Sequence, residues 1–117
     1  MGKYLETAEA WHEDGLIGGT HEAIELHNIS LTSGASVTRG DILCQDSLGT
    51  WSQASVAADA GKPLCIAAED FAADTVSAVT QGYFAGVMNR DKVMVGGAAS
   101  VNDFEQSLRT QNIRLTK

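Results

Sequence analysis

The chain has 117 residues, the size of one domain, and its 44% hydrophobic and 20% charged residues are typical of a folded globular protein. Its 15 acids against 8 Lys and Arg residues give a net charge of −7, which disfavours contact with a phosphate backbone. Only 6% of the residues are aromatic, so few rings are present on which bases could stack, and the composition argues against a nucleic-acid-binding protein.

No apolar stretch approaches the length of a membrane span, and the first residues lack the basic-then-apolar order of a signal peptide. We therefore expect no membrane partner and a chain that is made in the cytoplasm.

Residues 1–21 differ in composition from the rest and read as an extended N-terminal arm, followed by a body over residues 22–117. In residues 1–22 five acids face one base, Lys3. The large apolar residues of the arm stand at irregular spacing among these acids: Tyr4, Leu5, Trp11, Leu16 and Ile17. Because an acidic segment with a few apolar anchors typically orders only against a partner, we expect these five side chains to contact another protein.

The first half of the body reads as short strands joined by turns. Residues 22–31 alternate imperfectly between apolar and polar side chains, which predicts a first strand. Residues 46–49 begin with Asp and end with Gly, which predicts a four-residue turn. This turn would join a strand over 42–45 to its hairpin partner over 51–54.

The second half of the body continues in the same way. Pro63 precedes a strand over 64–68, at a position where its missing donor does little harm. A polar turn follows over 69–74. The longest strand is predicted over 76–84, with Gly82 as a bulge or a point of close approach, and a short strand is predicted over 93–95.

The last element is a helix that follows Ser100, a good N-cap residue. Val101, Phe104 and Leu108 form one apolar stripe at helical spacing, and Asn112 can end the helix. We expect this helix to pack on the body. The predicted fold is mainly β: a small barrel-like or sandwich-like body with one C-terminal helix and an extended N-terminal arm.

The residues that carry chemistry do not form a recognisable site. His12, His21 and His27 do not pair at helical spacing and are weak evidence for a metal. Cys44 and Cys65 lie inside apolar runs, which favours buried free thiols and leaves a disulfide open. Because no nucleophile elbow, P-loop or dinucleotide fingerprint occurs, we expect no enzyme, no cofactor and no metal.

One alternative function rests on Lys92. Asp91-Lys92-Val93 resembles the hairpin that carries the modified lysine of lipoyl domains, and residues 37–43 are similar to a turn of those domains. Two observations count against this resemblance. Asn89-Arg90 occupies the place where lipoyl domains have an acidic residue, and a carrier domain would leave the N-terminal arm and the C-terminal helix without a role. The alternative is a lipoyl-like or biotinyl-like carrier domain with Lys92 as the acceptor.

Four phrases, taken in order, resemble the head decoration proteins of tailed bacteriophages, the family of the lambda decoration protein. They are Arg39-Gly40-Asp41-Ile42-Leu43 with Gly49-Thr50-Trp51, then Gly61-Lys62-Pro63-Leu64-Cys65-Ile66-Ala67, then Gly82-Tyr83-Phe84 with Asn89, and finally the helix leading to Asn112-Ile113-Arg114-Leu115. The resemblance covers roughly residues 22–117 and extends to the arm only in kind.

The resemblance implies a homotrimer that binds the major capsid protein at three-fold and quasi-three-fold positions on the outside of the expanded head. It implies that the arm reaches onto the capsid, and that the protein stabilises the virion against the pressure of packaged DNA. For the contacts between copies we expect the strand over 76–84 and the basic C-terminal segment to contribute, through Val79, Tyr83, Phe84 and Arg114.

Overall fold

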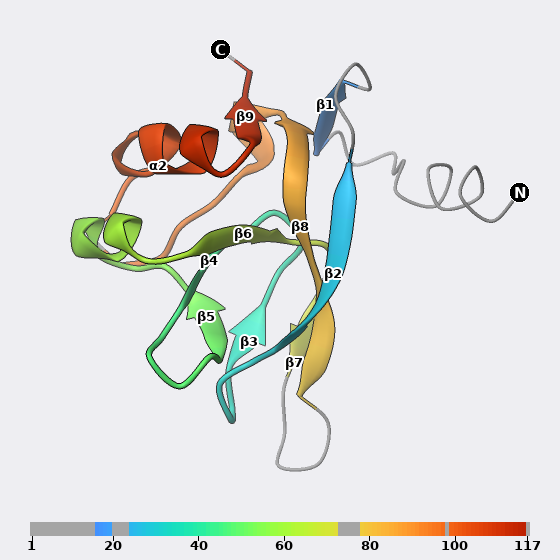
Figure 1. Cartoon of the computed structure of the whole chain (residues 1–117), viewed down its shortest axis with the longest axis vertical. Coiled ribbons are helices and arrows are strands. Elements are labelled where there is room, and N and C mark those ends of the chain that lie inside the picture. The colour runs from blue at the N-terminus through green and yellow to red at the C-terminus, as the bar shows by residue number, and fades with distance from the viewer. Residues whose placement is uncertain (1–15, 20–23, 73–77, 98, 117) are drawn as a thin grey trace, which may run out of the picture.

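The computed structural model describes residues 16–19, 24–72, 78–97 and 99–116. Within them the fold is mainly β, as the sequence predicted, with a seven-stranded sheet and a separate two-stranded sheet (Figure 1). The strands are β1 (Ile17–Gly19), β2 (Glu25–Ser30), β3 (Ser36–Val37), β4 (Ile42–Gln45), β5 (Trp51–Gln53), β6 (Leu64–Ala67), β7 (Phe71–Ala72), β8 (Val79–Met88) and β9 (Ile113–Leu115). The helical elements are the 3-10 helices η1 (Ala57–Gly61), η2 (Arg90–Lys92) and η3 (Val101–Asp103) and the α-helix α2 (Glu105–Thr110).

The strand β8, with 10 residues, organises the large sheet. β1 and β2 pair with it one after the other, both antiparallel, along one of its edges. On its other edge it pairs antiparallel with β6 and, further along, parallel with β9. β6 then pairs with β4, and β4 with β5, so that the order across the sheet ends in a hairpin.

Each face of the large sheet carries its own hydrophobic core. β4 and β6 are buried on both faces, which explains their uninterrupted apolar sequences. One core lies under α2 and β9 and includes Ile42, Ile66 and Phe104. The other lies on the opposite face, beside the two-stranded sheet of β3 and β7, and includes Leu43 and Cys65.

The sheet curls back on itself without closing. Leu31, directly after β2, forms an isolated bridge with Trp51 of β5, and the N–H of Thr32 donates to the carbonyl oxygen of Trp51 at 2.9 Å. This single bridge brings the two outer strands of the sheet together. The result is compatible with a sandwich-like body and is not a closed barrel.

Most local predictions are confirmed. The strand over 42–45 and the turn over 46–49 occur as predicted, and the N–H of Gly49 donates to the carbonyl oxygen of Asp46 at 3.0 Å. At Gly82 the predicted close approach is real, because a Cβ there would lie 2.8 Å from the Sγ of Cys65. The C-terminal helix forms as η3 and α2, and its Phe104 and Leu108 are fully buried on the body.

Three predictions about element boundaries are wrong. The longest strand continues to Met88, where β1 and β9 flank it. The polar turn over 69–74 contains the short strand β7, which pairs with β3. Between residues 93 and 95 only one bridge forms, from Met94 to Asp41. In each case a pairing partner far away in the sequence decides the outcome.

The body begins before residue 22. Leu16 and Ile17, which were assigned to the arm, are 1% and 6% exposed and belong to the first core, and β1 pairs with β8. Residues 16–19 therefore belong to the body and not to the predicted arm. Tyr4, Leu5 and Trp11 fall outside the described residues.

Candidate interaction surface

The two ends of the described chain meet at the end of β8, a region called here the terminal pole and formed by Leu16, Ile17, Met88, Asn89 and Thr116. The N–H of Asn89 donates to the carbonyl oxygen of Leu16 at 2.7 Å. The N–H of Thr116 donates to the carbonyl oxygen of Met88 at 2.9 Å. Ile17 on one side and Leu115 on the other are both in register with Met88. The first described residue, Leu16, therefore lies next to the C-terminal end of the described chain.

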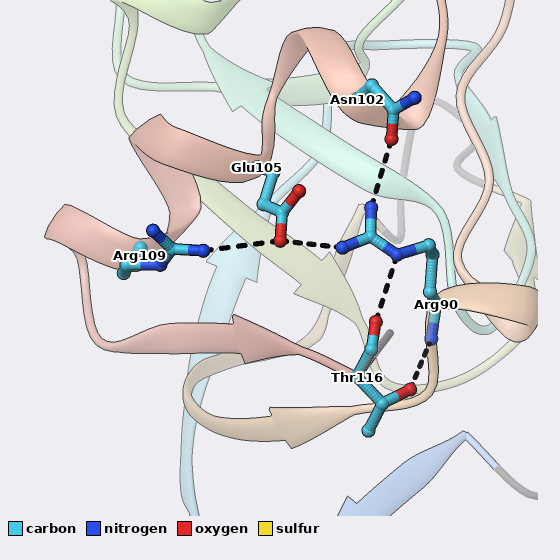
Figure 2. A network of polar contacts seen from close by, with 5 residues as sticks. All are labelled: Arg90, Asn102, Glu105, Arg109 and Thr116. Atoms are coloured by element: carbon cyan, nitrogen blue, oxygen red, sulfur yellow. Dashed lines mark hydrogen bonds and ion pairs between the residues drawn. The ribbon is translucent and has the colours of Figure 1, made fainter.

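A polar network centred on Arg90 holds the terminal pole together (Figure 2). The backbone N–H of Arg90 donates to Oγ1 of Thr116 at 3.1 Å, and its Nε donates to the carbonyl oxygen of Thr116 at 2.9 Å. The two remaining guanidinium nitrogens reach Oδ1 of Asn102 at 3.0 Å and Oε2 of Glu105 at 2.6 Å. One side chain thus joins η2, η3, α2 and the residue that follows β9.

Charge strengthens this network. The side chains of Arg90 and Glu105 are about three-quarters buried, and Arg109, one helical turn after Glu105, contacts the same carboxylate oxygen at 3.3 Å. The hydrogen bond from Arg90, and then the charges of Arg90 and Arg109, lower the pKa of Glu105 below its ordinary value. Since charge-assisted hydrogen bonds are stronger than neutral ones, the ionised Glu105 stabilises this arrangement of the pole at neutral pH.

The residues expected to contact other copies lie in different environments. Tyr83 is 1% exposed, and its hydroxyl accepts a hydrogen bond from Arg39 at 2.8 Å, so its side chain belongs to the interior of the body. Val79 is 57% exposed at the start of β8. Phe84 is half-buried between the rings of His27 and Trp51, and Arg114 is exposed on β9.

The most exposed large hydrophobic side chain of the described residues is Leu48, at the tip of the β4–β5 hairpin, with an exposed fraction of 87%. The carboxylate of Asp46 holds this tip by accepting hydrogen bonds from the N–H of Leu48 at 2.9 Å and of Thr50 at 3.1 Å, and from the Thr50 hydroxyl at 2.8 Å. Sequence analysis missed Leu48. The signal was present, because a large apolar residue stood inside a turn predicted from Asp46 and Gly49.

Among the described residues, the groups that could carry chemistry do not form a recognisable site. Cys44 and Cys65 are free and buried, and burial raises the pKa of each thiol. No three His, Cys, Asp or Glu side chains within the described ranges gather as a metal site. No helix of the described residues is long and apolar enough to cross a membrane.

Lys92 does not lie on a β-hairpin. It is exposed at the end of η2, and the chain continues through the buried Val93 to the single bridge at Met94. This geometry differs from the tight hairpin on which a carrier domain presents its acceptor lysine.

No protein-family model matches this chain, and no curated protein matches its sequence.

Proposed function

We propose that this chain is a head decoration protein of a tailed bacteriophage, which binds the outside of the expanded capsid as a homotrimer at three-fold and quasi-three-fold positions. The observation that supports the proposal is the burial of Leu16 and Ile17 at the terminal pole, directly after residues 1–15 in the sequence. It adds to the resemblance of the four sequence phrases. The protein would act without catalysis or a cofactor, on the surface of the virion after synthesis in the host cytoplasm.

The attachment matters because a flexible segment transmits force from its partner to the body only if the point where it joins the body is fixed. Leu16 and Ile17 anchor the base of the arm in the core, and the Arg90 network fixes the strands around it. Residues 1–15 would supply the capsid contacts, with Tyr4, Leu5 and Trp11 as apolar anchors and the backbone available to add a strand to a sheet edge of the major capsid protein.

Trimerisation would compensate for the cost of ordering each arm. Ordering a segment of this length weakens a single attachment. Three arms on one trimer bind at high effective concentration once the first is attached, so the overall affinity exceeds that of any one arm. A trimer that binds only the expanded lattice stabilises that lattice by mass action. The decorated capsid would therefore resist the pressure of the packaged DNA. The net charge of −7 suits a protein that stays outside, away from the packaged DNA.

The experiment compares the full chain with a variant that begins at residue 16, using expanded, undecorated capsids of the parent phage in a pelleting assay. We expect the full chain to pellet with the capsids, and the shortened chain to stay folded in the supernatant. Full occupancy of the capsids by the shortened chain would show that the arm is not the binding element.

A further inference from the structure

Two of the chain segments that join the small sheet of β3 and β7 to the large sheet meet in a region called here the sheet junction, formed by residues 38–41 and 67–70. The first segment leads from β3 into β4, and the second leads from the end of β6 into β7. The N–H of Gly40 donates to the carbonyl oxygen of Ala67 at 2.9 Å and so connects the two segments. Because β3 and β7 both contribute side chains to the second core, opening the sheet junction would uncover part of that core.

Two carboxylates bind neighbouring N–H groups of the turn over residues 38–41. Asp41 accepts a hydrogen bond from the N–H of Thr38 at 2.8 Å, and Asp70 accepts one from the N–H of Arg39 at 2.8 Å. The side chain of Asp70 is exposed, whereas Asp41 is only 3% exposed. The turn therefore brings a buried and an exposed acidic group close together.

A third segment, residues 93–96, is bonded to the same turn. The N–H of Met94 donates to the carbonyl oxygen of Gly40 at 3.0 Å, and the N–H of Ile42 donates to the carbonyl oxygen of Met94 at 2.8 Å. Met94 is also in register with Asp41. The sheet junction and the segment over 93–96 thus enclose the Asp41 carboxylate between them.

Asp41 has no basic partner among the residues that the structure describes, where the ion pairs involve other carboxylates. The turn itself contributes Arg39, whose Nη1 donates to the hydroxyl of Tyr83 at 2.8 Å. Lys92, directly before the third segment, is exposed. The buried carboxylate is therefore held by dipoles and not by an opposite charge.

The other groups around Asp41 are neutral or bound elsewhere. From β5, the amide group of Gln53 interacts with the carboxylate. Glu69, the third acid of the sheet junction, accepts a hydrogen bond from the hydroxyl of Thr80 on β8 at 2.5 Å. Residues 93–96 contain no titratable side chain. Asp70 is thus the charged group that acts on Asp41 from the segment packed against it.

Burial makes the ionised form of Asp41 unfavourable. It raises the pKa of this carboxyl above the ordinary value of 3.8 and outweighs the opposite effect of the hydrogen bonds from Thr38 and Gln53, while the charge of Asp70 adds to the increase. The cost of the ionised form is fully present above the raised pKa and disappears below 3.8. The sheet junction should therefore gain stability as the pH falls, in contrast to the Arg90 network, which should lose it.

We infer that the sheet junction is a proton-responsive hinge, which holds the small sheet and residues 93–96 more tightly when Asp41 carries a proton than when it is ionised. The inference goes beyond the proposed function and does not depend on it. Protonation removes the buried negative charge and its repulsion with Asp70, while the backbone hydrogen bonds of the junction stay in place. The predicted effect is thus local and concerns the opening of the junction.

Amide hydrogen exchange followed by NMR tests the inference on the full chain, at pH 7 and at pH 4, just above the ordinary value of 3.8. We expect the protection factors of the N–H groups of Gly40 and Met94 to rise several-fold at the lower pH. Asp41→Asn, which removes the charge at nearly the same size, should give high protection at both pH values. The matched control is Asp46→Asn at the turn of the β4–β5 hairpin, which should leave the pH response of Gly40 and Met94 as in the wild type.

The titration of Asp41 in the wild type gives a second readout that does not depend on the folding of a variant. The ¹³C shift of its carboxyl group, followed against pH, should change with a midpoint above 3.8. A midpoint at or below 3.8 would overturn the inference. Protection factors of Gly40 and Met94 that are equal at pH 7 and pH 4 would overturn it as well.

Discussion

Gly40 is the residue on which the entry into β4 depends most. It lies in the turn in which the N–H of Asp41 donates to the carbonyl oxygen of Thr38 at 2.9 Å, and its φ is +100°. A Cβ at this position would also lie 2.4 Å from the carbonyl oxygen of Lys92, so a side chain would meet both backbone strain and a backbone atom.

We expect Gly40→Ala to lower the free energy of unfolding by about 2 kcal/mol or more, measured by urea denaturation. Gly34→Ala is the control, because Gly34 also has a positive φ, +81°, but a Cβ there would have no atom within 4 Å. Its loss should be clearly smaller. Equal losses in the two variants would mean that the approach of Lys92 carries no cost.

At the residue scale, sequence analysis identified apolar and turn residues well but could not assign them to a surface. Tyr83 and Val79 lie on the same predicted strand and on the same face, yet one is buried beside Arg39 and the other is exposed. The difference depends on how far the core extends along β8. Local pattern carries no information on that extent, because the covering residues come from distant segments.

At the scale of elements, α2 and η3 form a lid on the first core. Phe104, between them, is 0% exposed and packs in that core. Phe104→Ala should lower the free energy of unfolding by about 3–5 kcal/mol and expose apolar surface, so that solubility falls as well. An unchanged melting temperature would contradict this packing. Gln106→Ala, an exposed position of the same lid, should cost far less.

The Arg90 network should make the lid sensitive to acid. The pKa of Glu105 is lowered in the folded state, chiefly by its hydrogen bond from Arg90, so its contribution to stability is present above its ordinary pKa of 4.5. That contribution is lost as the pH falls below 4.5 and through the lowered folded value. Asp46 and Asp59, whose pKa values are also lowered, act in the same direction.

We therefore expect Glu105→Gln to be less stable than the wild type at pH 7, with the difference shrinking as the pH approaches 3. Melting temperatures measured from pH 7 to pH 3 give the comparison. Glu25→Gln changes an exposed carboxylate outside the network and should leave the curve near that of the wild type. A constant difference between Glu105→Gln and the wild type across this range would show that the ion pair does not contribute.

Elements formed by neighbouring residues could be predicted, and elements formed by distant pairing could not. The hairpin of β4 and β5 follows from the Asp46–Gly49 turn, the apolar run before it and Trp51 after it. β1, β7 and β9 are short and exist through partners far along the chain: β8 for β1 and β9, and β3 for β7. A segment of two or three residues has too weak a pattern to be recognised without its partner.

At the scale of the whole molecule, the first and the last described residues meet at the terminal pole, where Leu16 and Thr116 both hydrogen-bond to the end of β8 and the residue after it. The site at the pole was not predictable, because it arises from strands at both ends of the chain meeting on β8. The sequence predicted an arm and a basic C-terminal segment, but it did not predict that the two lie close together.

This arrangement predicts where the arm can be cut. A chain that begins at residue 16 keeps Leu16 and Ile17 in the core and should melt within a few degrees of the full chain. A chain that begins at residue 21 loses both side chains and β1, at about 2–5 kcal/mol for each buried aliphatic residue. Thermal melts of the two truncations make the comparison. Similar melting temperatures would place the boundary at residue 21 after all.

Decoration of a phage head is tested most directly by electron microscopy of expanded, undecorated capsids of the parent phage after incubation with the full chain. We expect new density at the three-fold and quasi-three-fold positions, with the terminal pole facing the capsid, and capsids that withstand a higher temperature. Capsids that remain bare at saturating protein concentration would contradict this expectation, and mass spectrometry of Lys92 for a lipoyl or biotinyl group would then be the next step.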